Sequence, residues 1–262
     1  MIEILSFYTL PSEIRSDYIP LKIWQTYKTD QLPEKAKECQ LTWKDQPNYH
    51  YHFMDDAQID QFMKKHFSSD IYKTFNSLPM GVMKADMWRY CVLYVHGGIY
   101  TDIDSIALQP LEDWKIQESD RIIIALENDL HFCQWTILAE PGHPILKKVI
   151  DLIVKEAKNG IDTSTEHFVH KHTGPGIWSR AVQLTLGFPE YQSASDTYKL
   201  YLTNKDKSDS VFQKLGVRIE NDQYFAGEKV KNLYGSTQFG DGYVSWMDER
   251  DKIISAEKST TK

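Results

Sequence analysis

The chain has 262 residues, of which 41% are hydrophobic and 13% aromatic, and it carries a formal net charge of −7. This composition is typical of a folded globular protein, excludes a disordered or low-complexity chain, and suits one large α/β domain. The acidic balance argues against nucleic acid as a partner, because binding a phosphate backbone requires a clustered basic surface.

The cysteines and the apolar segments indicate in which cellular compartment the protein is expected. Cys39, Cys91 and Cys133 are odd in number and form no Cys-x-x-Cys pair, so neither a zinc ribbon nor a disulfide framework is predicted. The chain start lacks a basic leader, no apolar stretch approaches the ~20 residues of a membrane helix, and no Asn-x-Ser/Thr occurs. We expect a cytoplasmic protein without a transmembrane segment, and peripheral association at the inner face of the membrane stays open.

Strand and helix signals alternate through the first third of the chain. Period-two alternation predicts strands, and apolar residues at helical spacing predict amphipathic helices. Pro33 suits a first helical turn, Pro47 stops that helix, and Asp55 or Asp56 can cap the next one. The predicted order is a strand over 19–26, a helix from 33, a strand over 49–54, a helix from 55, and a helix over 71–78.

A longer helix and a glycine turn follow. Apolar residues recur at helical spacing over 80–96, and Gly97-Gly98 can supply a left-handed cap and a sharp exit. The β-prone run 99–101 then leads into Asp102-Ile103-Asp104. We therefore expect the two carboxylates on a strand directly after a helix-turn junction.

The second half continues the alternation with weaker signals. Strands are predicted over 121–126, 135–139, 217–219 and 223–226, and helices over 145–158 and 175–186, the latter with Thr173 as N-cap. The polar stretch 192–210 indicates a surface excursion, residues 234–246 an ordered loop, and the charged residues 248–262 a frayed tail.

The Asp-x-Asp pair is the first candidate for chemistry. Alternate residues of a strand point to the same side, so Asp102 and Asp104 would face a common point while Ile103 is buried opposite. Oxygen ligands of this kind suit Mg²⁺ or Mn²⁺, with coordination positions left for phosphate and water. Taken alone the spacing is weak evidence, because such pairs are most often solvated strand ends.

The preceding helix adds two polar groups. Asp86 and Arg89 are spaced i and i+3, so they share one helix face. Either they form a surface ion pair of little energetic value, or they converge with the two aspartates on one cleft.

These motifs together resemble the glycosyltransferases of family 32, related to the yeast initiating α-1,6-mannosyltransferase and to bacterial capsular polysaccharide glycosyltransferases. The resemblance spans about residues 19–180. It is carried by Ile19-Pro20-Leu21-Lys22-Ile23-Trp24-Gln25-Thr26, Lys84-Ala85-Asp86, Arg89, Leu93-Tyr94, the run 97–104, Pro141-Gly142-His143-Pro144 and Thr173-Gly174-Pro175.

The resemblance implies an α/β fold of GT-A type, a single Rossmann-like domain over 1–262 with a mixed central sheet. Residues 19–130 would form the part that binds the nucleotide-sugar and the metal. Residues 131–247 would form the acceptor side and a closing loop, and 248–262 the tail.

The resemblance also implies roles for individual residues. Trp24, Gln25 and Thr26 would line the nucleotide pocket, which agrees with ligand binding at the carboxyl ends of strands in open α/β sheets. Asp86 and Arg89 would bind hydroxyls of the donor sugar, and Tyr100 and Asp102 would contact ribose or sugar. Asp104 would bind Mn²⁺ or Mg²⁺ most directly.

The sequence departs from the family pattern at two places. Gln134 stands where members usually carry Asn, so it is a candidate for catalytic contacts. The family's C-terminal His beside a Gly-Ser-Trp element has only the partial match Ser245-Trp246, with Asp241 as a candidate further metal ligand. We predict that Trp246 donates its indole N–H to a phosphate oxygen, the alternative being a Trp packed at the edge of the core.

The predicted function is metal-dependent, retaining transfer of a hexose from a nucleotide-sugar donor to a hydroxyl of a glycan, glycolipid or glycosylated protein. A UDP-sugar is favoured, and GDP-mannose is the alternative donor. A bound cation would neutralise the charge that grows on the diphosphate leaving group.

Other functions would account for single features of the sequence. A haloacid-dehalogenase-like phosphatase also uses Asp-x-Asp, but Gly240-Asp241 is followed by Ser245 where a second Asp is needed. The aromatic excess would suit a non-catalytic carbohydrate-binding module. His167, His170 and His172 form no recognisable zinc motif and are interpreted as surface or acceptor-groove residues.

Overall fold

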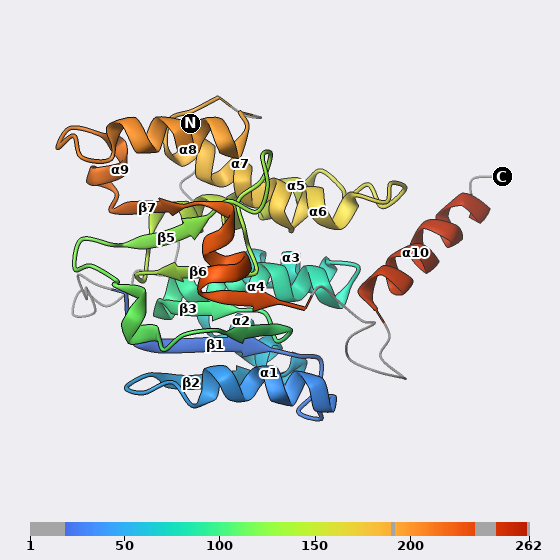
Figure 1. Cartoon of the computed structure of the whole chain (residues 1–262). Coiled ribbons are helices and arrows are strands. Elements are labelled where there is room, and N and C mark those ends of the chain that lie inside the picture. Colours follow the sequence, from blue (N-terminus) through green and yellow to red (C-terminus); the bar gives the residue numbers. More distant parts are fainter. Residues whose placement is uncertain (1–18, 190–191, 234–244, 261–262) are drawn as a thin grey trace.

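The computed structural model describes residues 19–189, 192–233 and 245–260. They form a six-stranded sheet in the order β2-β1-β3-β6-β5-β7, covered by helices (Figure 1). Only β6 runs antiparallel to its neighbours in this sheet. The mixed α/β architecture predicted from the sequence is confirmed.

The first half of the chain follows the predicted alternation as far as residue 101, and the two short elements after it were not predicted. Its elements are β1 (Lys22–Thr26), α1 (Glu34–Lys44), β2 (His50–Met54), α2 (Asp56–His66), α3 (Ser69–Ser77), α4 (Gly81–His96), β3 (Gly98–Thr101), β4 (Ser105–Ala107) and η1 (Leu111–Trp114). The predicted cap of α2 is Asp55, whose carboxylate accepts from the Gln58 backbone N–H in a reciprocal capping box.

The second half confirms the strands and helices that have strong apolar patterns. Its elements are β5 (Ile122–Ala125), β6 (Thr136–Ala139), α5 (Pro144–Lys158), α6 (Phe168–His172), α7 (Pro175–Thr185), α8 (Ala194–Asn204), α9 (Val211–Lys214), β7 (Val217–Glu220), η2 (Tyr224–Glu228), β8 (Val230–Asn232) and α10 (Trp246–Thr260). Strands β4 and β8 pair in a separate antiparallel ribbon.

Two predictions for this half are wrong, and the predicted surface excursion contains a helix that was not expected. The polar stretch 192–210 is largely helical, because Tyr201 packs against Phe212 and buries one side of α8. Residues 223–226 are helical instead of extended and form the start of η2. Gly174, and not Thr173, is the N-cap of α7. The predicted loop 234–246 lies mostly outside the described residues, and much of the predicted tail forms α10.

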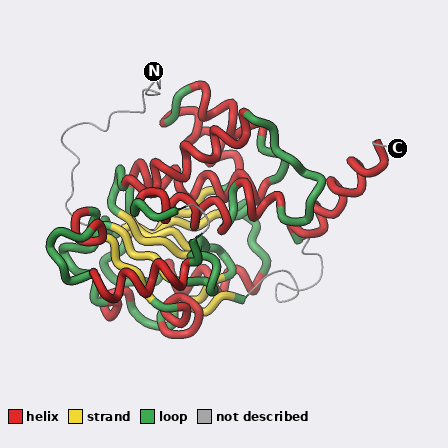
Figure 2. Tube along the Cα trace, turned by 90° about the horizontal axis from the view of Figure 1, so that it is seen from above, coloured by secondary structure: helices red, strands yellow, loops and turns green. Residues whose placement is uncertain are grey.

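The sheet separates two apolar cores. Helices lie on both sides of the strands (Figure 2). Alternate residues of β1, β3 and β5 point to opposite faces. Trp24, Tyr100 and Ile122 join the core formed with α2 to α7. Ile23 and Ile99 join the core beneath α1, η1 and η2.

The junction between α4 and β3 is fixed by the two predicted glycines. Gly97 and Gly98 have φ values of 61° and 104°, which side chains rarely tolerate. A Cβ atom on Gly98 would stand 2.5 Å from the Lys22 carbonyl oxygen, because β1 and β3 are neighbours here. The glycines thus turn the chain from α4 directly into the strand that leads to the aspartates.

Helix α10 projects from the body of the protein, and its first turns hold it there (Figure 1). The Arg250 side chain donates to the Glu166 carbonyl at 3.3 Å, and Ile254 is buried at the edge of the main core. No helix in the described ranges is long and apolar enough to cross a membrane.

All three cysteines are free thiols buried in the interior. Burial raises the pKa of Cys39 to about 11 and raises the pKa values of Cys91 and Cys133 well above the ordinary range.

Candidate active site

The sheet topology gathers polar residues at one edge. The carboxyl ends of the mutually parallel strands β1, β3 and β5 meet there, together with the start of the antiparallel β6. Gln25 and Thr26 end β1, Asp102 directly follows β3, Glu127 lies two residues after β5, and Gln134 lies two residues before β6. Ligands of open α/β sheets bind at this edge, so it is the natural place for a site.

The two aspartates lie on a turn between β3 and β4, and their predicted placement on a strand is wrong. The Asp102 N–H donates to the Trp135 carbonyl at 2.9 Å, while the Asp102 carbonyl accepts from the Ser105 N–H at 3.1 Å and from the Gln25 amide at 3.1 Å. Ile103 is buried as predicted. The turn still brings Asp102 and Asp104 to one cleft.

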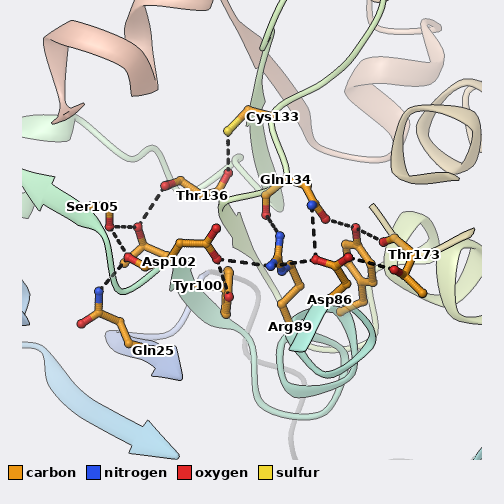
Figure 3. Close-up of polar contacts among 12 residues, drawn as sticks. Gln25, Asp86, Arg89, Tyr100, Asp102, Ser105, Cys133, Gln134, Thr136 and Thr173 are labelled. Carbon is orange, nitrogen blue, oxygen red and sulfur yellow. Dashed lines mark hydrogen bonds and ion pairs between the residues drawn. The ribbon is translucent and has the colours of Figure 1, made fainter. Parts of the chain in front are cut away.

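Arg89 links helix α4 to this turn (Figure 3). One guanidinium nitrogen, Nη2, lies 2.9 Å from an Asp86 carboxylate oxygen and 3.2 Å from Oδ1 of Asp102. The other, Nη1, donates to the Gln134 carbonyl at 3.2 Å, and the guanidinium stacks 4.8 Å from the centre of the Tyr100 ring. The Asp86–Arg89 pair is therefore a buried junction and not a surface ion pair.

Asp86 is fully enclosed and hydrogen-bonded. The Thr173 hydroxyl donates to it at 2.8 Å and the Gln134 amide at 3.3 Å. Burial raises the pKa of Asp86 to about 6, against the opposing effects of Arg89 and of these hydrogen bonds. Thr173 was predicted only as a helix cap, so its contact with the site was missed.

Two phenols complete the network. The Tyr100 hydroxyl donates to Asp102 Oδ1 at 2.6 Å, so that oxygen is held from two sides and the carboxylate orientation is fixed. The Tyr90 hydroxyl donates to the Gln134 side-chain oxygen at 2.6 Å, which turns the Gln134 amide N–H towards Asp86. The predicted catalytic candidates Asp86, Arg89, Asp102 and Gln134 are thus in one connected cluster.

A cleft of about 310 Å³ opens beside this cluster. Its walls come from the end of β1, the start of α4, the aspartate turn and the start of α10. They include Thr26, Tyr27, Lys28, Asp56, Arg89, Tyr100, Asp102, Asp104, Ser245, Trp246 and Glu249.

The three predicted nucleotide residues on β1 have different positions. Thr26 lines the cleft, whereas Gln25 is fully buried and supports the aspartate turn. Trp24 is not brought to the cleft: it shares the sheet face of Thr26 and Tyr100, but its indole points towards the start of β3 and away from the carboxyl end of β1. Its indole N–H donates to the Gly97 carbonyl at 2.9 Å, and its ring stacks 4.3 Å from that of His52.

The predicted C-terminal residues reach the same cleft in part. Ser245 and Trp246 line it at the start of α10, where the Ser245 hydroxyl accepts from the Met247 N–H at 3.2 Å. Trp246 is 37% exposed, so it is available to a ligand and is not packed in the core. Asp241 lies outside the described residues.

The donor set suits a hard divalent cation. Asp102 and Asp104 supply carboxylate oxygens at the cleft, and Mg²⁺ and Mn²⁺ prefer such ligands together with phosphate and water. Within the described ranges no group of three or more His, Cys, Asp or Glu residues could hold a metal. His167, His170 and His172 accordingly form no such group.

Sequence comparison identifies proteins similar to this chain. The family described as "Glycosyltransferase sugar-binding region containing DXD motif" matches residues 33–120. An initiation-specific alpha-1,6-mannosyltransferase of Candida albicans is 30% identical over 67% of this chain and 55% of its own length. The protein of the same name from Schizosaccharomyces pombe is 34% identical over 63% and 48%. The chain spans about half the length of these curated relatives.

Structural comparison agrees on the fold. The PaToxG glycosyltransferase superposes with a TM-score of 0.56 over 76% of this chain and 79% of that one, at 21% identity. The predicted GT-A type of α/β fold is therefore confirmed. With the aspartate turn and the Asp86–Arg89 pair inside the matched segment, the chain belongs to the glycosyltransferases whose sugar-binding region contains a DXD motif.

Proposed function

We propose that this chain transfers a hexose, with a divalent cation, from a nucleoside-diphosphate sugar to an acceptor hydroxyl. The observation that carries the proposal is the position of Arg89, which joins Asp86 to Asp102 at the wall of a cleft that also contains Asp104. A purely structural ion pair would have no need of two further aspartates at an open edge of the sheet.

Different residues would bind the diphosphate and the hexose of the donor. Asp102 and Asp104 would hold Mn²⁺ or Mg²⁺, which when bound neutralises the charge of the departing diphosphate. Asp86 and Arg89 would bind the hydroxyls of the hexose, since their buried, hydrogen-bonded positions leave them little freedom to reorient. Trp246 would donate its indole N–H to a phosphate oxygen from the start of α10.

The proposed reaction retains the anomeric configuration. The bond between the anomeric carbon and the diphosphate oxygen breaks, the acceptor oxygen bonds to that carbon from the same face, and the acceptor proton leaves with the diphosphate. This stereochemistry follows from the family resemblance.

For the donor we propose a mannose nucleotide, GDP-mannose. The sequence favoured a UDP-sugar, but relatives in two yeasts are named alpha-1,6-mannosyltransferases, and another in Schizosaccharomyces pombe is named inositol phosphoceramide mannosyltransferase 1, at 28% identity over 52% of this chain and 43% of its own length. These names also support a glycan or glycolipid hydroxyl as acceptor.

A donor panel with Mn²⁺ tests the proposal. GDP-mannose and several UDP-sugars are incubated with the protein, and the release of nucleoside diphosphate is measured with and without a chelator. We expect chelator-sensitive release from GDP-mannose, lowered about a hundredfold or more in Asp104→Asn, since the metal then loses a charged ligand.

The control is Asp113→Asn, an exposed carboxylate on η1 away from the cleft, which should keep wild-type activity. Release that is insensitive to chelator, or equal activity in Asp104→Asn and wild type, would contradict the assignment. Phosphate release from an aryl phosphate would instead favour the phosphatase reading.

A further inference from the structure

Glu127 lies two residues after the carboxyl end of β5, at the same sheet edge as Asp102 and Gln134. Its position is fixed by a tight turn. The Glu127 N–H donates to the His131 carbonyl at 2.9 Å, and the Asn128 side chain accepts from the N–H groups of Leu130 and His131, each at 2.9 Å. The backbone that carries Glu127 is therefore rigid without any help from its side chain.

The Glu127 carboxyl group interacts electrostatically with the charges of the active site. Burial raises the pKa of its carboxyl group, the nearby Asp102 raises it further, and Arg89 acts in the opposite direction. Glu127 likewise adds to the raised pKa of Tyr90, whose hydroxyl bonds Gln134. Glu127 follows β5 at the sheet edge that also carries Asp102 and Gln134, which puts it on the β5 side of the sugar-binding cluster.

One oxygen of this carboxylate is buried without a partner. Glu127 Oε2 has no hydrogen-bond donor among the described residues. Leaving a desolvated carboxylate oxygen unpaired is costly, and the neighbouring Asp102 charge increases the cost. By contrast, the carboxylate of Glu220, at the same end of the adjacent strand β7, pairs with Arg218 at 2.6 Å.

The unpaired Glu127 oxygen is explained if the substrate supplies its hydrogen-bond donor. Polar groups held at such an energetic cost are concentrated at functional sites. Sugar hydroxyls are uncharged donors of suitable size. The strongest acceptor that a protein side chain offers them is a carboxylate.

Resting on the proposed glycosyl transfer, we infer that the Glu127 carboxylate accepts a hydrogen bond from a hexose hydroxyl during the reaction. The hydroxyl belongs either to the transferred hexose or to the acceptor sugar, and the chemistry of recognition is the same in both. Glu127 is then a further substrate-binding residue, separate from the metal turn.

The Glu127→Gln variant tests this inference through two opposite effects. It removes a buried charge and keeps the shape of the side chain, so the melting temperature should stay or rise, by about 2 °C for each kcal/mol gained. At the same time sugar binding should weaken by roughly tenfold or more, because a hydrogen bond to a charged acceptor is lost. A residue with a structural role only would lose stability and leave substrate affinity unchanged.

Three binding and rate measurements locate the hydroxyl. Affinity for GDP with Mn²⁺ alone should equal that of wild type. If the hydroxyl belongs to the donor, affinity for GDP-mannose falls. If it belongs to the acceptor, KM for methyl α-mannoside rises at saturating donor while donor hydrolysis is unchanged. Glu220→Gln is the matched control and should leave all three values unchanged.

Several outcomes would overturn the inference. These are weaker binding of GDP with Mn²⁺ in Glu127→Gln, a lowered melting temperature, or wild-type constants for both donor and acceptor. Failure of the wild-type protein to bind any sugar nucleotide would instead overturn the proposed function. A rise in melting temperature in Glu127→Gln, which needs no substrate, would still show that the carboxylate is energetically unfavourable in the fold.

Discussion

At the scale of single residues, Arg89 combines a structural and a functional role. Its guanidinium is buried with Asp86 and reaches Asp102, so it is the only described cation that the structure places between these two carboxylates. Removing one partner of a buried ion pair leaves an uncompensated charge. Loss of Arg89 should therefore affect folding as well as turnover.

We predict that Arg89→Ala loses activity and also about 3–5 kcal/mol of the free energy of unfolding, measured by denaturant titration. The reason is that the Asp86 carboxylate remains buried without its counter-charge. Adding Asp86→Asn should restore part of the stability and none of the activity.

The control for Arg89→Ala is Lys37→Ala, which removes a cation at the same i, i+3 spacing from Glu34 on an exposed helix face. Its unfolding transition should match that of wild type. An Arg89→Ala protein as stable as Lys37→Ala would mean that Asp86 is not held in a dry environment.

Sequence reasoning found most single residues of the site and missed others for definable reasons. Asp86, Arg89, Asp102 and Asp104 came from motif spacing, which survives even though the aspartates lie on a turn. Trp24 lies away from the cleft because its indole packs on His52 and bonds the Gly97 carbonyl, long-range contacts that the local sequence does not reveal. Glu127 could have been found, since it follows the apolar run 122–126 just as Asp102 follows 99–101.

At the scale of elements, the glycine turn between α4 and β3 governs the position of the whole aspartate turn. Gly98 approaches the Lys22 backbone so closely that no side chain fits, and its φ of 104° is unfavourable for other residues. Any displacement there would move β3 relative to β1 and shift Asp102 out of reach of Arg89.

Gly98→Ala should lower the free energy of unfolding by about 2 kcal/mol or more and reduce turnover with it. Gly160→Ala is a matched control, because Gly160 also has a positive φ, 92°, but open space where the Cβ atom would stand. The difference between the free energies of unfolding of the two variants measures the energetic cost of placing a side chain between β3 and β1. Equal values would contradict that explanation.

Elements with a strong apolar period were predictable, and those that depend on tertiary packing were not. Helix α4 and strand β5 are apolar enough that their own sequences determine them. Helix α8 is polar in composition, and the packing of Tyr201 on Phe212, with burial of Ala194 and the N-cap of Ser193, favours it over a loop. The segment 223–226 alternates over too few residues to separate a strand from the helical turns of η2.

At the scale of the whole molecule, buried imidazoles make folding sensitive to acid. His143 is completely buried, accepts from the Ile145 N–H, and contacts the Leu215 carbonyl at 3.0 Å. Burial lowers the pKa of His143 to about 4, and burial with nearby cations lowers that of His96 to about 4. Unfolding returns both groups to ordinary pKa values near 6.5, so the unfolded chain binds more protons between these limits.

The free energy of unfolding should therefore fall as pH is lowered from about 6.5 to about 4, with roughly 2–3 kcal/mol of the loss due to His143. Asp86 acts in the opposite direction, because its raised pKa favours protonation in the folded protein. The useful measurement is thus the difference between wild type and His143→Asn across this range.

In His143→Asn the pH dependence should be shallower, whatever the variant's absolute stability at neutral pH. His167→Gln, which removes an exposed imidazole, serves as the control. An identical slope in His143→Asn and wild type would show that His143 is not the group that takes up the proton.

The burial of every cysteine has a practical consequence for following the protein at work. Since all three thiols are shielded and hard to ionise, a maleimide dye should react poorly with the native chain. A single cysteine introduced at exposed Leu130, beside the Glu127 turn, would then carry the only efficient label. Fluorescence from that position could report the arrival of an acceptor without interference from the interior.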